Sequence, residues 1–470
     1  MLPRSADTVR DGLLVVRGRP RTEIAHRHAP LHDHGVKPST YVAWNRWPVP
    51  GDQAVLTLSD RYAPLPDLPR SYIAYGNGRS YSDVCLNDGG FLLDTHRLDK
   101  FVSFDRDTGR LACEAGVLLS DLLELIVPHG WFLPVTPGTR EITVGGAIAN
   151  DVHGKNHHGA GTFSAHVQAL GLRRSDGSLR VCGPSQNPDW FAATVGGLGL
   201  TGVILWAEIQ LLRITSPMMT VQALRFRNLD EFWTVNATAS AEWPYTVAWV
   251  DCMSARPGRL GRGVLFCGRH AAVVEPLTSR RGRPLRIGID PPFSLINYPT
   301  VRAFNALYYR THGSTGIGAS HYAPFFYPLD GVQDWNRLYG PRGFFQYQCV
   351  LPFPQAVSAV ATVLERIARS GEASFLAVLK TFGDARPVGI LSFPRPGVTL
   401  AVDLPNRGER TLRLMRNLDD VVLEAGGALY PAKDARMPAR LFRAGYPRFA
   451  EFARFIDPLA SSGFWRRVSE

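Results

Sequence analysis

The sequence predicts an α+β protein of two domains, and three observations lead to this prediction. The chain has 470 residues, which is more than one ordinary hydrophobic core can hold. Between residues 70 and 215, short apolar runs alternate with glycine turns, as in a domain of short strands with few helices. From 216 to 400 the glycine motifs thin out, aromatic residues become dense and longer helical patterns appear.

Turn signals separate the predicted strands of the first region. Asp107-Thr108-Gly109 and Asp176-Gly177 each lie between two apolar runs, which is typical of a hairpin. One helix is predicted over residues 119–127, where leucine and isoleucine recur at helical spacing. The predicted strands are residues 71–75, 91–94, 101–104, 110–114, 170–173 and 179–182.

Two helices, one strand and one loop are predicted in the second region. Apolar residues have helical spacing in residues 355–369 and in 411–424, which ends at a glycine pair. Residues 398–404 alternate cleanly, which predicts a half-buried strand whose second face (Thr399, Ala401 and Asp403) lines a cavity. The small residues of 313–319 predict a mobile loop.

Composition excludes several classes of protein. Apolar residues make up 45% and charged residues 20% of the chain, which is ordinary for a globular protein. Dispersed arginines carry the net charge of +11 without a long basic run or a nucleic-acid-binding motif, so nucleic-acid binding is not expected, and an anionic substrate or an anionic membrane surface stays open. No run suits a signal peptide or a membrane span, and the six cysteines show no paired spacing. A reducing cytoplasm is therefore expected.

Glycine-rich segments are the candidate anion-binding loops. In residues 76–83 (GNGRSYSD), uncovered backbone N–H groups suit a pyrophosphate. Residues 137–161 (PGTREITVGGAIANDVHGKNHHGAG) form a second loop, and residues 194–204 (TVGGLGLTGVI) form a third. His153 and His157 are four apart, but flanking glycines predict a loop rather than one helical face, and no metal site is expected.

The chain contains only five lysines among its 52 lysine and arginine residues. Arginine is used wherever a positive charge suffices, so each lysine is a candidate for a site that needs a compact ammonium group. Lys155, Lys380 and Lys433 are the three that lie in motif-like segments, and Lys433 has apolar neighbours in sequence.

The three glycine segments, in this order and spacing, resemble the FAD-binding half of the vanillyl-alcohol-oxidase superfamily. Within it, residues 325–352, 374–383, 396–405 and 426–436 are similar to the decaprenylphosphoryl-β-D-ribose 2′-oxidase family. The resemblance implies a PCMH-type FAD-binding fold, with a substrate domain made of an antiparallel sheet covered by helices. The implied parts are a loose N-terminal segment (1–40), an FAD-binding domain (41–215), a substrate-binding domain (216–427) and a C-terminal segment returning to the FAD domain (428–470).

The resemblance also implies which residues contact the cofactor. Many superfamily members bond the flavin to a histidine of the first loop, but this chain has Arg79-Ser80 there, so FAD is expected to be non-covalent. The implied FAD contacts are Ala74, Tyr75, Gly76, Asn77, Gly78, Arg79, Ser80, Tyr81, Ser82, Asp83, Val84, Gly138, Thr143, Val144, Gly145, Gly146, Asn150, Asp151, Val152, His153, Val203, Ile204 and Tyr430.

Lys433 matches the family's active-site lysine, and Tyr81 and His153 are expected to flank the same cavity. An ammonium group there stabilises the negative charge left when hydride reaches flavin N5. Alternatively, Lys433 orients the substrate hydroxyl or accepts its proton, and a base role requires a pKa below about 10.4. Gln346 and Gln348 alternate on a strand and suit sugar hydroxyls, although an edge strand facing water has the same pattern. The implied substrate contacts are Lys155, Gln346, Gln348, Lys380, Asp403 and Lys433.

The implied activity is FAD-dependent oxidation of a secondary hydroxyl of a sugar. In the family this is C2′ of decaprenylphosphoryl-β-D-ribose, and the keto sugar is the first half of an epimerisation in arabinan and cell-wall precursor synthesis. The implied partner is a short-chain reductase, and the implied electron acceptor is oxygen or a quinone. The implied membrane contact is peripheral, at the inner face of the membrane. Two alternatives stay open: a flavin oxidase of another carbohydrate (an alditol, an aldonolactone or a natural-product sugar), and a flavin-binding partner subunit without catalysis.

Overall fold

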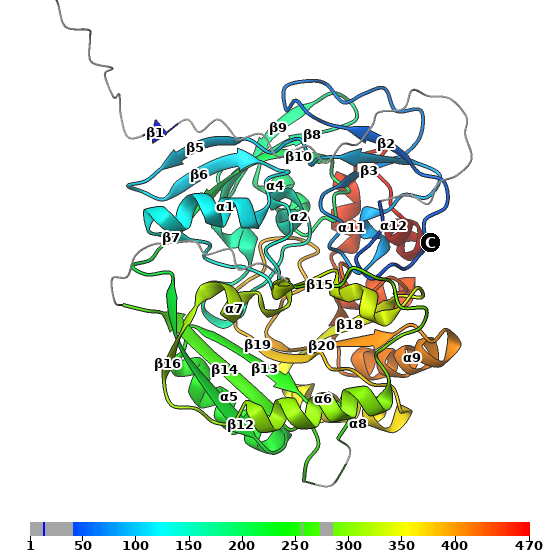
Figure 1. Cartoon of the computed structure of the whole chain (residues 1–470). Coiled ribbons are helices and arrows are strands. Elements are labelled where there is room, and N and C mark those ends of the chain that lie inside the picture. The colour runs from blue at the N-terminus through cyan, green and yellow to red at the C-terminus, as the bar shows by residue number, and fades with distance from the viewer. Residues whose placement is uncertain (1–12, 15–40, 255, 257, 273–284) are drawn as a thin grey trace, which may run out of the picture.

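The computed structural model describes residues 13–14, 41–254, 256, 258–272 and 285–470. Figure 1 shows two parts stacked one above the other, with most of the N-terminal half in the upper part and a large sheet with its helices in the lower part. The predicted loose segment, residues 1–40, lies outside the described residues except for Leu13–Leu14, which form strand β1. Among the described helices, none is long and apolar enough to cross a membrane.

Two main sheets build the upper part. One is parallel, in the order β2-β4-β3, and the other is antiparallel, in the order β1-β5-β6-β10-β8-β9, while β11 pairs with β7 alone. The strands are β2 (Ala54–Thr57), β3 (Tyr72–Tyr75), β4 (Phe91–Asp94), β5 (Phe101–Asp105), β6 (Arg110–Glu114), β7 (Trp131–Phe132), β8 (Val167–Arg173), β9 (Leu179–Cys182), β10 (Val203–Gln210) and β11 (Leu212–Arg213).

The helices of the upper part are short, as predicted. Leu119, Leu122, Leu123 and Ile126 of α1 are fully buried, because their helical spacing places them on the face that packs into the core beside the six-stranded sheet. The helices are α1 (Leu119–Ile126), α2 (Val144–Ala149), α3 (His157–Ala160) and α4 (Pro188–Thr194).

An eight-stranded antiparallel sheet forms the lower part, in the order β16-β12-β14-β13-β19-β20-β18-β21. Helices α5, α8 and α9 cover one of its faces, and α6 crosses in front of it in Figure 1. The strands are β12 (Met218–Phe226), β13 (Tyr245–Val250), β14 (Gly263–His270), β16 (Gly318–His321), β18 (Phe344–Leu351), β19 (Ala377–Phe382), β20 (Gly397–Pro405) and β21 (Ala428–Leu429). The helices are α5 (Leu229–Glu242), α6 (Tyr298–Thr311), α7 (Tyr322–Phe326), α8 (Phe353–Ser370) and α9 (Glu409–Glu424); a separate pair is β15 (Leu285–Arg286) with β17 (Val332–Gln333).

The central strands β18 and β20 place polar side chains on one face of the large sheet. Gln346 pairs with Asp403 and Gln348 with Ala401, and directly opposed residues share a face. The prediction that β20 is half-buried is wrong, since almost all of it is buried. The reason is tertiary: helices cover one face, and the other face lies against the opposite part of the molecule.

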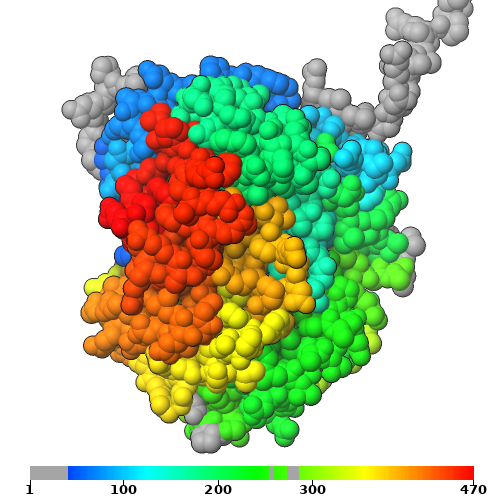
Figure 2. Space-filling view, turned by 180° about the vertical axis from the view of Figure 1, so that it is seen from behind, coloured from blue at the N-terminus to red at the C-terminus, as the bar shows by residue number. Residues whose placement is uncertain are grey.

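A C-terminal segment returns from the large sheet to the upper part. It contains α10 (Ala439–Gly445), α11 (Phe449–Phe452) and α12 (Gly463–Ser469). Tyr72 in β3 donates its backbone N–H to Leu459 and accepts from Ser461, each at 2.8 Å. Figure 2 shows this segment in red against the blue and teal residues of the upper part. The predicted loop at 313–319 ends earlier than expected, because Gly318 and Ala319 pair with β12.

Candidate active site between the two parts

One large cavity lies between the two parts of the molecule. Its volume is 2030 Å³, against roughly 300–1,000 Å³ for a site that holds one small ligand. Loops of the upper part line one side, and strands β12, β13, β14, β18, β19 and β20 line the other. The cavity therefore has room for a large cofactor and a substrate together.

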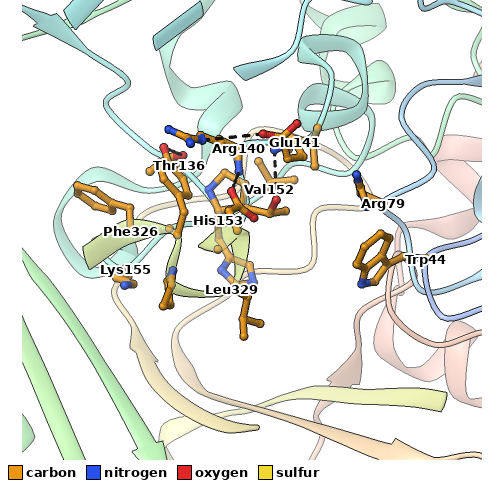
Figure 3. A pocket seen from close by; sticks show the side chains of 18 of the residues that line it. Trp44, Arg79, Thr136, Arg140, Glu141, Val152, His153, Lys155, Phe326 and Leu329 are labelled. Carbon is orange, nitrogen blue, oxygen red and sulfur yellow. Dashed lines mark hydrogen bonds and ion pairs between the residues drawn. The ribbon is translucent and has the colours of Figure 1, made fainter. Parts of the chain in front are cut away.

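The first glycine loop follows β3 into the cavity wall. Gly78 has a φ of 59°, and an added Cβ would strike neighbouring atoms, so glycine is required there. Asn77 Nδ2 donates to the Glu141 carbonyl at 2.7 Å, which joins this loop to the second one. The Arg79 guanidinium lies 4.1 Å from the Trp44 ring centroid, on one side of the cavity in Figure 3.

The second glycine loop contains the short helix α2. Thr143 Oγ1 accepts from the Gly146 N–H at 3.1 Å and caps this helix. A Cβ added at Gly138 would meet no atom within 4 Å, so the backbone there is open to the cavity. Tyr430 Oη donates to the Asn150 carbonyl at 2.7 Å, which brings the C-terminal segment to the same loop.

The atoms of this wall fit a bound dinucleotide. Arg79 Nε and Asn150 Oδ1 are buried and have no hydrogen-bond partner among the described residues. Buried polar atoms are almost always paired, so a donor and an acceptor left open on a cavity wall suit a polar ligand. Open backbone at glycines and at the start of a helix suits phosphate. FAD meets both requirements.

Lys433 lies where the first loop meets the C-terminal segment. Its Nζ is 3.6 Å from the Tyr81 ring centroid, a cation–π contact. The Tyr81 N–H donates to the Ala432 carbonyl at 2.8 Å and holds the two segments together. Burial lowers the pKa of Lys433 to about 7, although the negative charge of Asp403 acts in the opposite direction.

Asp403 is fully buried behind Gln346 and does not line the cavity. Gln346 Nε2 donates to Asp403 Oδ1 at 2.5 Å. Burial raises the pKa of Asp403 to about 7, against the effects of Gln346 and Lys433. Asp403 is therefore placed to affect Lys433 through its charge and to hold Gln346 through a hydrogen bond.

His153 joins polar side chains from three segments. Its Nδ1 lies 3.1 Å from Lys380 Nζ, and its Nε2 lies 3.0 Å from Gln348 Nε2. Gln348 also donates to Thr399 Oγ1 at 3.2 Å. Burial, and then the charge of Lys380, hold the pKa of His153 well below its ordinary value, so the imidazole is neutral at pH 7. Burial also lowers the pKa of Lys380 to about 7.

Lys155 lies in another corner of the same cavity. Its Nζ donates to the Phe325 carbonyl and is 4.5 Å from the centroid of the Phe325 ring. Burial lowers its pKa to about 7. With Lys380 and Lys433, it places three amines on the walls of one cavity, an arrangement that attracts an anionic ligand.

Most of the predicted site residues line this cavity. They are Ala74, Gly76, Asn77, Gly78, Arg79, Ser80, Tyr81, Val84, Gly138, Thr143, Gly145, Gly146, Asn150, Val152, His153, Lys155, Ile204, Gln346, Gln348, Lys380, Tyr430 and Lys433. The predicted residues that do not line it are Tyr75, Ser82, Asp83, Val144, Asp151, Val203 and Asp403.

Several of the residues outside the lining hold the loops in place. Ser82 Oγ donates to the Pro431 carbonyl at 2.7 Å. Asp83 forms a bidentate ion pair with Arg467, at 2.6 and 2.9 Å. Asp151 accepts a hydrogen bond from Ser392. Because these side chains bond to other parts of the protein, they hold the loops in place from the side that faces away from the cavity.

Another part of the cavity wall was not predicted from the sequence. Trp44 precedes the first glycine loop and belongs to no recognisable pattern. Tyr327 Oη lies 2.7 Å from Thr136 Oγ1, and Asp330 Oδ2 accepts from the Arg140 N–H at 2.9 Å. Tyr327 and Asp330 belong to residues 325–352, where a polar turn within an aromatic run was the only available signal.

Comparisons with known proteins agree with this site. A family described as an FAD binding domain matches residues 62–183, which include the whole of the first and second glycine loops. Decaprenylphosphoryl-beta-D-ribose oxidase of Mycolicibacterium smegmatis is 39% identical over 402 residues, covering 83% of this chain and 86% of the relative. L-gulonolactone oxidase of Mus musculus is 34% identical over 137 residues, covering 29% and 30%. D-arabinono-1,4-lactone oxidase of Saccharomyces cerevisiae is 26% identical over 186 residues, covering 38% and 35%. The matches confirm the predicted cofactor, FAD, and the predicted reaction class, oxidoreduction.

Proposed function

Since this chain belongs to the family of FAD-dependent oxidoreductases that contains decaprenylphosphoryl-β-D-ribose oxidase, we propose that it oxidises C2′ of a prenylphosphoryl ribose. The product is the 2′-keto sugar. The similarity to the named relative extends over 83% of the chain and thus includes the substrate side of the cavity as well as the cofactor side.

We assign cofactor binding and substrate binding to the two parts according to the residues with which each part lines the cavity. We assign FAD to the glycine loops of residues 41–215 together with Tyr430, in a PCMH-type domain. The sugar belongs to residues 216–427, beside Gln346, Gln348 and Lys380, and residues 428–470 complete the cofactor domain. FAD is held without a covalent bond, because the first loop offers Arg79 and Ser80 where a histidine would be needed.

The reaction moves one proton and one hydride from the substrate. Bound FAD supplies the hydride acceptor for the hydrogen on C2′. Lys433 Nζ takes the proton of the 2′-hydroxyl, a role that suits an amine whose pKa burial lowers to about 7. Gln346 and Gln348 orient the sugar through its hydroxyl groups, and the amines of Lys155 and Lys380 face the phosphate end.

The observation that carries this proposal is the setting of Lys433. It is one of only five lysines, it lies on the cavity wall against Tyr81, and burial brings its pKa close to neutral pH. A lysine with only a structural role would need neither the position on the cavity wall nor the lowered pKa.

Anaerobic reduction of the bound flavin tests the substrate. We expect a prenylphosphoryl ribose to bleach the flavin absorption, whereas alditols and aldonolactones leave it unchanged. The lactone oxidases among the relatives favour the second candidate, an oxidase of another carbohydrate. Bleaching by polyols or lactones, without bleaching by prenylphosphoryl ribose, would support that candidate and overturn the first.

Lys433→Ala separates an enzyme from a flavin-binding partner subunit. We expect the variant to keep FAD and lose at least about a hundredfold in flavin reduction rate. Lys100→Ala is the matched control, because Lys100 is exposed and lies outside the cavity. Full cellular function of Lys433→Ala would identify a non-catalytic subunit.

The proposed role also sets the requirements for partners and location. The keto sugar needs a hydride donor to complete an epimerisation, which a short-chain reductase supplies. Reoxidation of the flavin needs oxygen or a quinone. A prenyl-linked substrate stays in a membrane, so we place the protein in the cytoplasm, peripherally at the inner face of the membrane.

A further inference from the structure

Exposed apolar side chains are concentrated in one stretch of the chain, which contains helix α6. Of the fourteen large apolar residues that are exposed in the described part of the chain, eight lie between residues 285 and 317. Isolated exposed apolar residues need no explanation, but a concentration of this kind marks an interaction surface. They are Leu285, Ile289, Phe293, Leu295, Tyr298, Phe304, Leu307 and Ile317, and the three that lie on α6 itself, Tyr298, Phe304 and Leu307, are here called the α6 patch.

Helix α6 has an inner and an outer side. Val301 and Asn305 are buried on the inner side, while Phe304 and Leu307 are 43% and 62% exposed on the outer side. Phe304 and Leu307 are three residues apart and thus neighbours on the helix surface.

The charge of the α6 patch has one sign. Residues 291–319 contain no aspartate or glutamate. Arg302 and Arg310 are exposed on α6. Asp290, just before this stretch, is paired with Arg46 at 2.7 Å. An apolar helix face flanked by arginines and free of carboxylates is complementary to anionic lipid headgroups.

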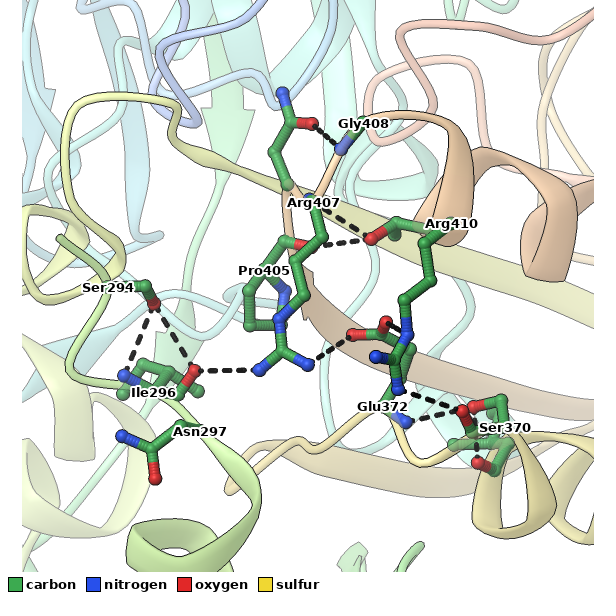
Figure 4. A network of polar contacts seen from close by, with 12 residues as sticks. Ser294, Ile296, Asn297, Ser370, Glu372, Pro405, Arg407, Gly408 and Arg410 are labelled. Atoms are coloured by element: carbon green, nitrogen blue, oxygen red, sulfur yellow. Dashed lines mark hydrogen bonds and ion pairs between the residues drawn. The ribbon is translucent and has the colours of Figure 1, made fainter.

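The start of α6 is firmly attached to the rest of the lower part. Asn297 and Thr300 form a capping box at its N-terminus. Arg407 donates to the Ile296 carbonyl at 3.4 Å, and Glu372, whose side chain is fully buried, forms ion pairs with Arg410 at 2.9 Å and with Arg407 at 3.5 Å (Figure 4). The outer side chains are therefore presented by a fixed helix.

Aromatic rings lead from the α6 patch to the cavity. The Phe304 and Tyr308 rings stack with centroids 5.6 Å apart, and Tyr308 stacks on His312 at 3.9 Å. Tyr308 and His312 line the cavity, as does Trp249, whose ring centroid lies 4.6 Å from that of Tyr308. The exposed patch and the cavity are thus continuous through α6.

We propose that the α6 patch docks the protein on the surface of an anionic phospholipid bilayer. Phe304 and Leu307 enter the boundary between headgroups and acyl chains, and Arg302 and Arg310 contact lipid phosphates. A second consequence rests on the proposed function: a substrate with a prenyl tail reaches the cavity past Tyr308 while its tail stays in the bilayer.

Co-sedimentation of the FAD-loaded protein with vesicles tests the docking without any substrate. We expect binding to vesicles of phosphatidylglycerol and phosphatidylcholine, and at least about tenfold weaker binding to phosphatidylcholine alone. Phe304→Ser with Leu307→Ser should weaken binding by at least about tenfold. Phe353→Ser with Val357→Ser is the matched control, since these exposed residues lie on α8, on the other side of the large sheet.

The charge is tested separately. Arg302→Glu with Arg310→Glu should remove the preference for anionic vesicles, whereas Arg413→Glu, on exposed α9 surface, should leave it unchanged. Equal loss in the α6 and α8 variants, or no vesicle binding by the unaltered protein, would overturn the proposal. So would a dimer in light scattering that Phe304→Ser dissociates, because the patch would then bind a second copy of the chain.

Flavin reduction by a water-soluble, short-chain prenylphosphoryl ribose distinguishes this inference from the proposed function. The α6 variants should reduce flavin at the rate of the unaltered protein with this substrate. Loss of vesicle binding with unchanged reduction supports docking. Failure of every prenylphosphoryl ribose to reduce the flavin would contradict the proposed function and leave the vesicle result standing.

Discussion

Three half-buried lysine amines face one cavity, and their partial removal from solvent lowers the pKa of each to about 7. Lys433 differs from Lys155 and Lys380 because a carboxyl group, that of Asp403, lies close enough to raise its pKa. Near neutral pH, Lys433 can therefore exist as an unprotonated amine, and this amine is still basic enough to accept a proton. This is the property that a general base requires.

The pH dependence of catalysis should report the titration of Lys433. A base acts only when unprotonated, so kcat/KM should fall about tenfold per pH unit below about 7 and level off above it. Steady-state kinetics between about pH 5 and about pH 9, roughly two units on either side of the expected pKa, measure this acidic limb of the kcat/KM profile. A rate that instead declines above pH 7 would show that the ammonium form is the active one.

Two substitutions should shift the acidic limb of the kcat/KM profile, and they should shift it in opposite directions along the pH axis. Asp403→Asn removes the charge that raises the pKa of Lys433, so the limb should move to lower pH. Lys380→Met removes a charge that lowers it, so the limb should move to higher pH. Lys100→Met, at an exposed site outside the cavity, is the control and should leave the limb in place. Shifts of the same sign would contradict the electrostatic account.

At a single position of the second loop, Gly138, we expect the absence of a side chain to be needed for cofactor binding. Gly138 faces the cavity with no atom within 4 Å of an added Cβ, and its backbone needs no left-handed conformation. Gly138→Val should therefore weaken FAD binding by at least about tenfold and leave the stability of the FAD-free protein within about 1 kcal/mol. Gly159→Val, equally open but outside the cavity, is the control in a fluorescence titration with FAD. Equal loss of FAD affinity in both variants would contradict this role.

At the scale of elements, the cofactor loops depend on a helix from the far end of the chain. Arg467 in α12 forms a bidentate pair with Asp83, whose side chain is 5% exposed. Asp83 lies at the end of the first glycine loop, so α12 supports that loop from behind. Tyr72 of β3 is joined to the same segment by two backbone hydrogen bonds.

Arg467→Leu should destabilise the protein by about 3 kcal/mol, because it leaves a buried carboxylate without its partner. FAD binding should weaken as well, since the first loop loses its support. Arg448→Leu breaks an exposed pair with Glu451 and should cost under about 1 kcal/mol. Urea unfolding compares the two. Equal stability losses would mean that the Asp83 pair is no stronger than a surface ion pair.

At the scale of the whole molecule, the cavity proposed to hold the flavin lies between two parts that must both be folded to enclose it, and the flavin is proposed to be bound there without a covalent bond. Denaturation should therefore release it. We expect acid precipitation to leave the yellow colour in the supernatant, and absorption spectra before and after precipitation measure it. Colour that stays with the precipitated chain would show a covalent bond to some other side chain.

Local pattern was enough to predict many elements. The predicted strands 91–94, 110–114 and 179–182 agree with β4, β6 and β9 residue for residue. The predicted helices 119–127 and 355–369 agree with α1 and α8 within two residues at each end. Apolar spacing and turn residues act over a few positions, so a single sequence contains this information.

By itself, the sequence determined the α+β class, the glycine loops and the lysines that matter, because these are properties of composition and short-range spacing. It could not determine that Lys433 lies against Tyr81, that Asp403 acts from behind Gln346, or that Trp44 reaches the cavity beside Arg79. Nor could it show that α6 leaves an apolar face in solvent. Only the tertiary structure decided these points, because burial and the pKa values that follow from it depend on contacts between residues far apart in the chain.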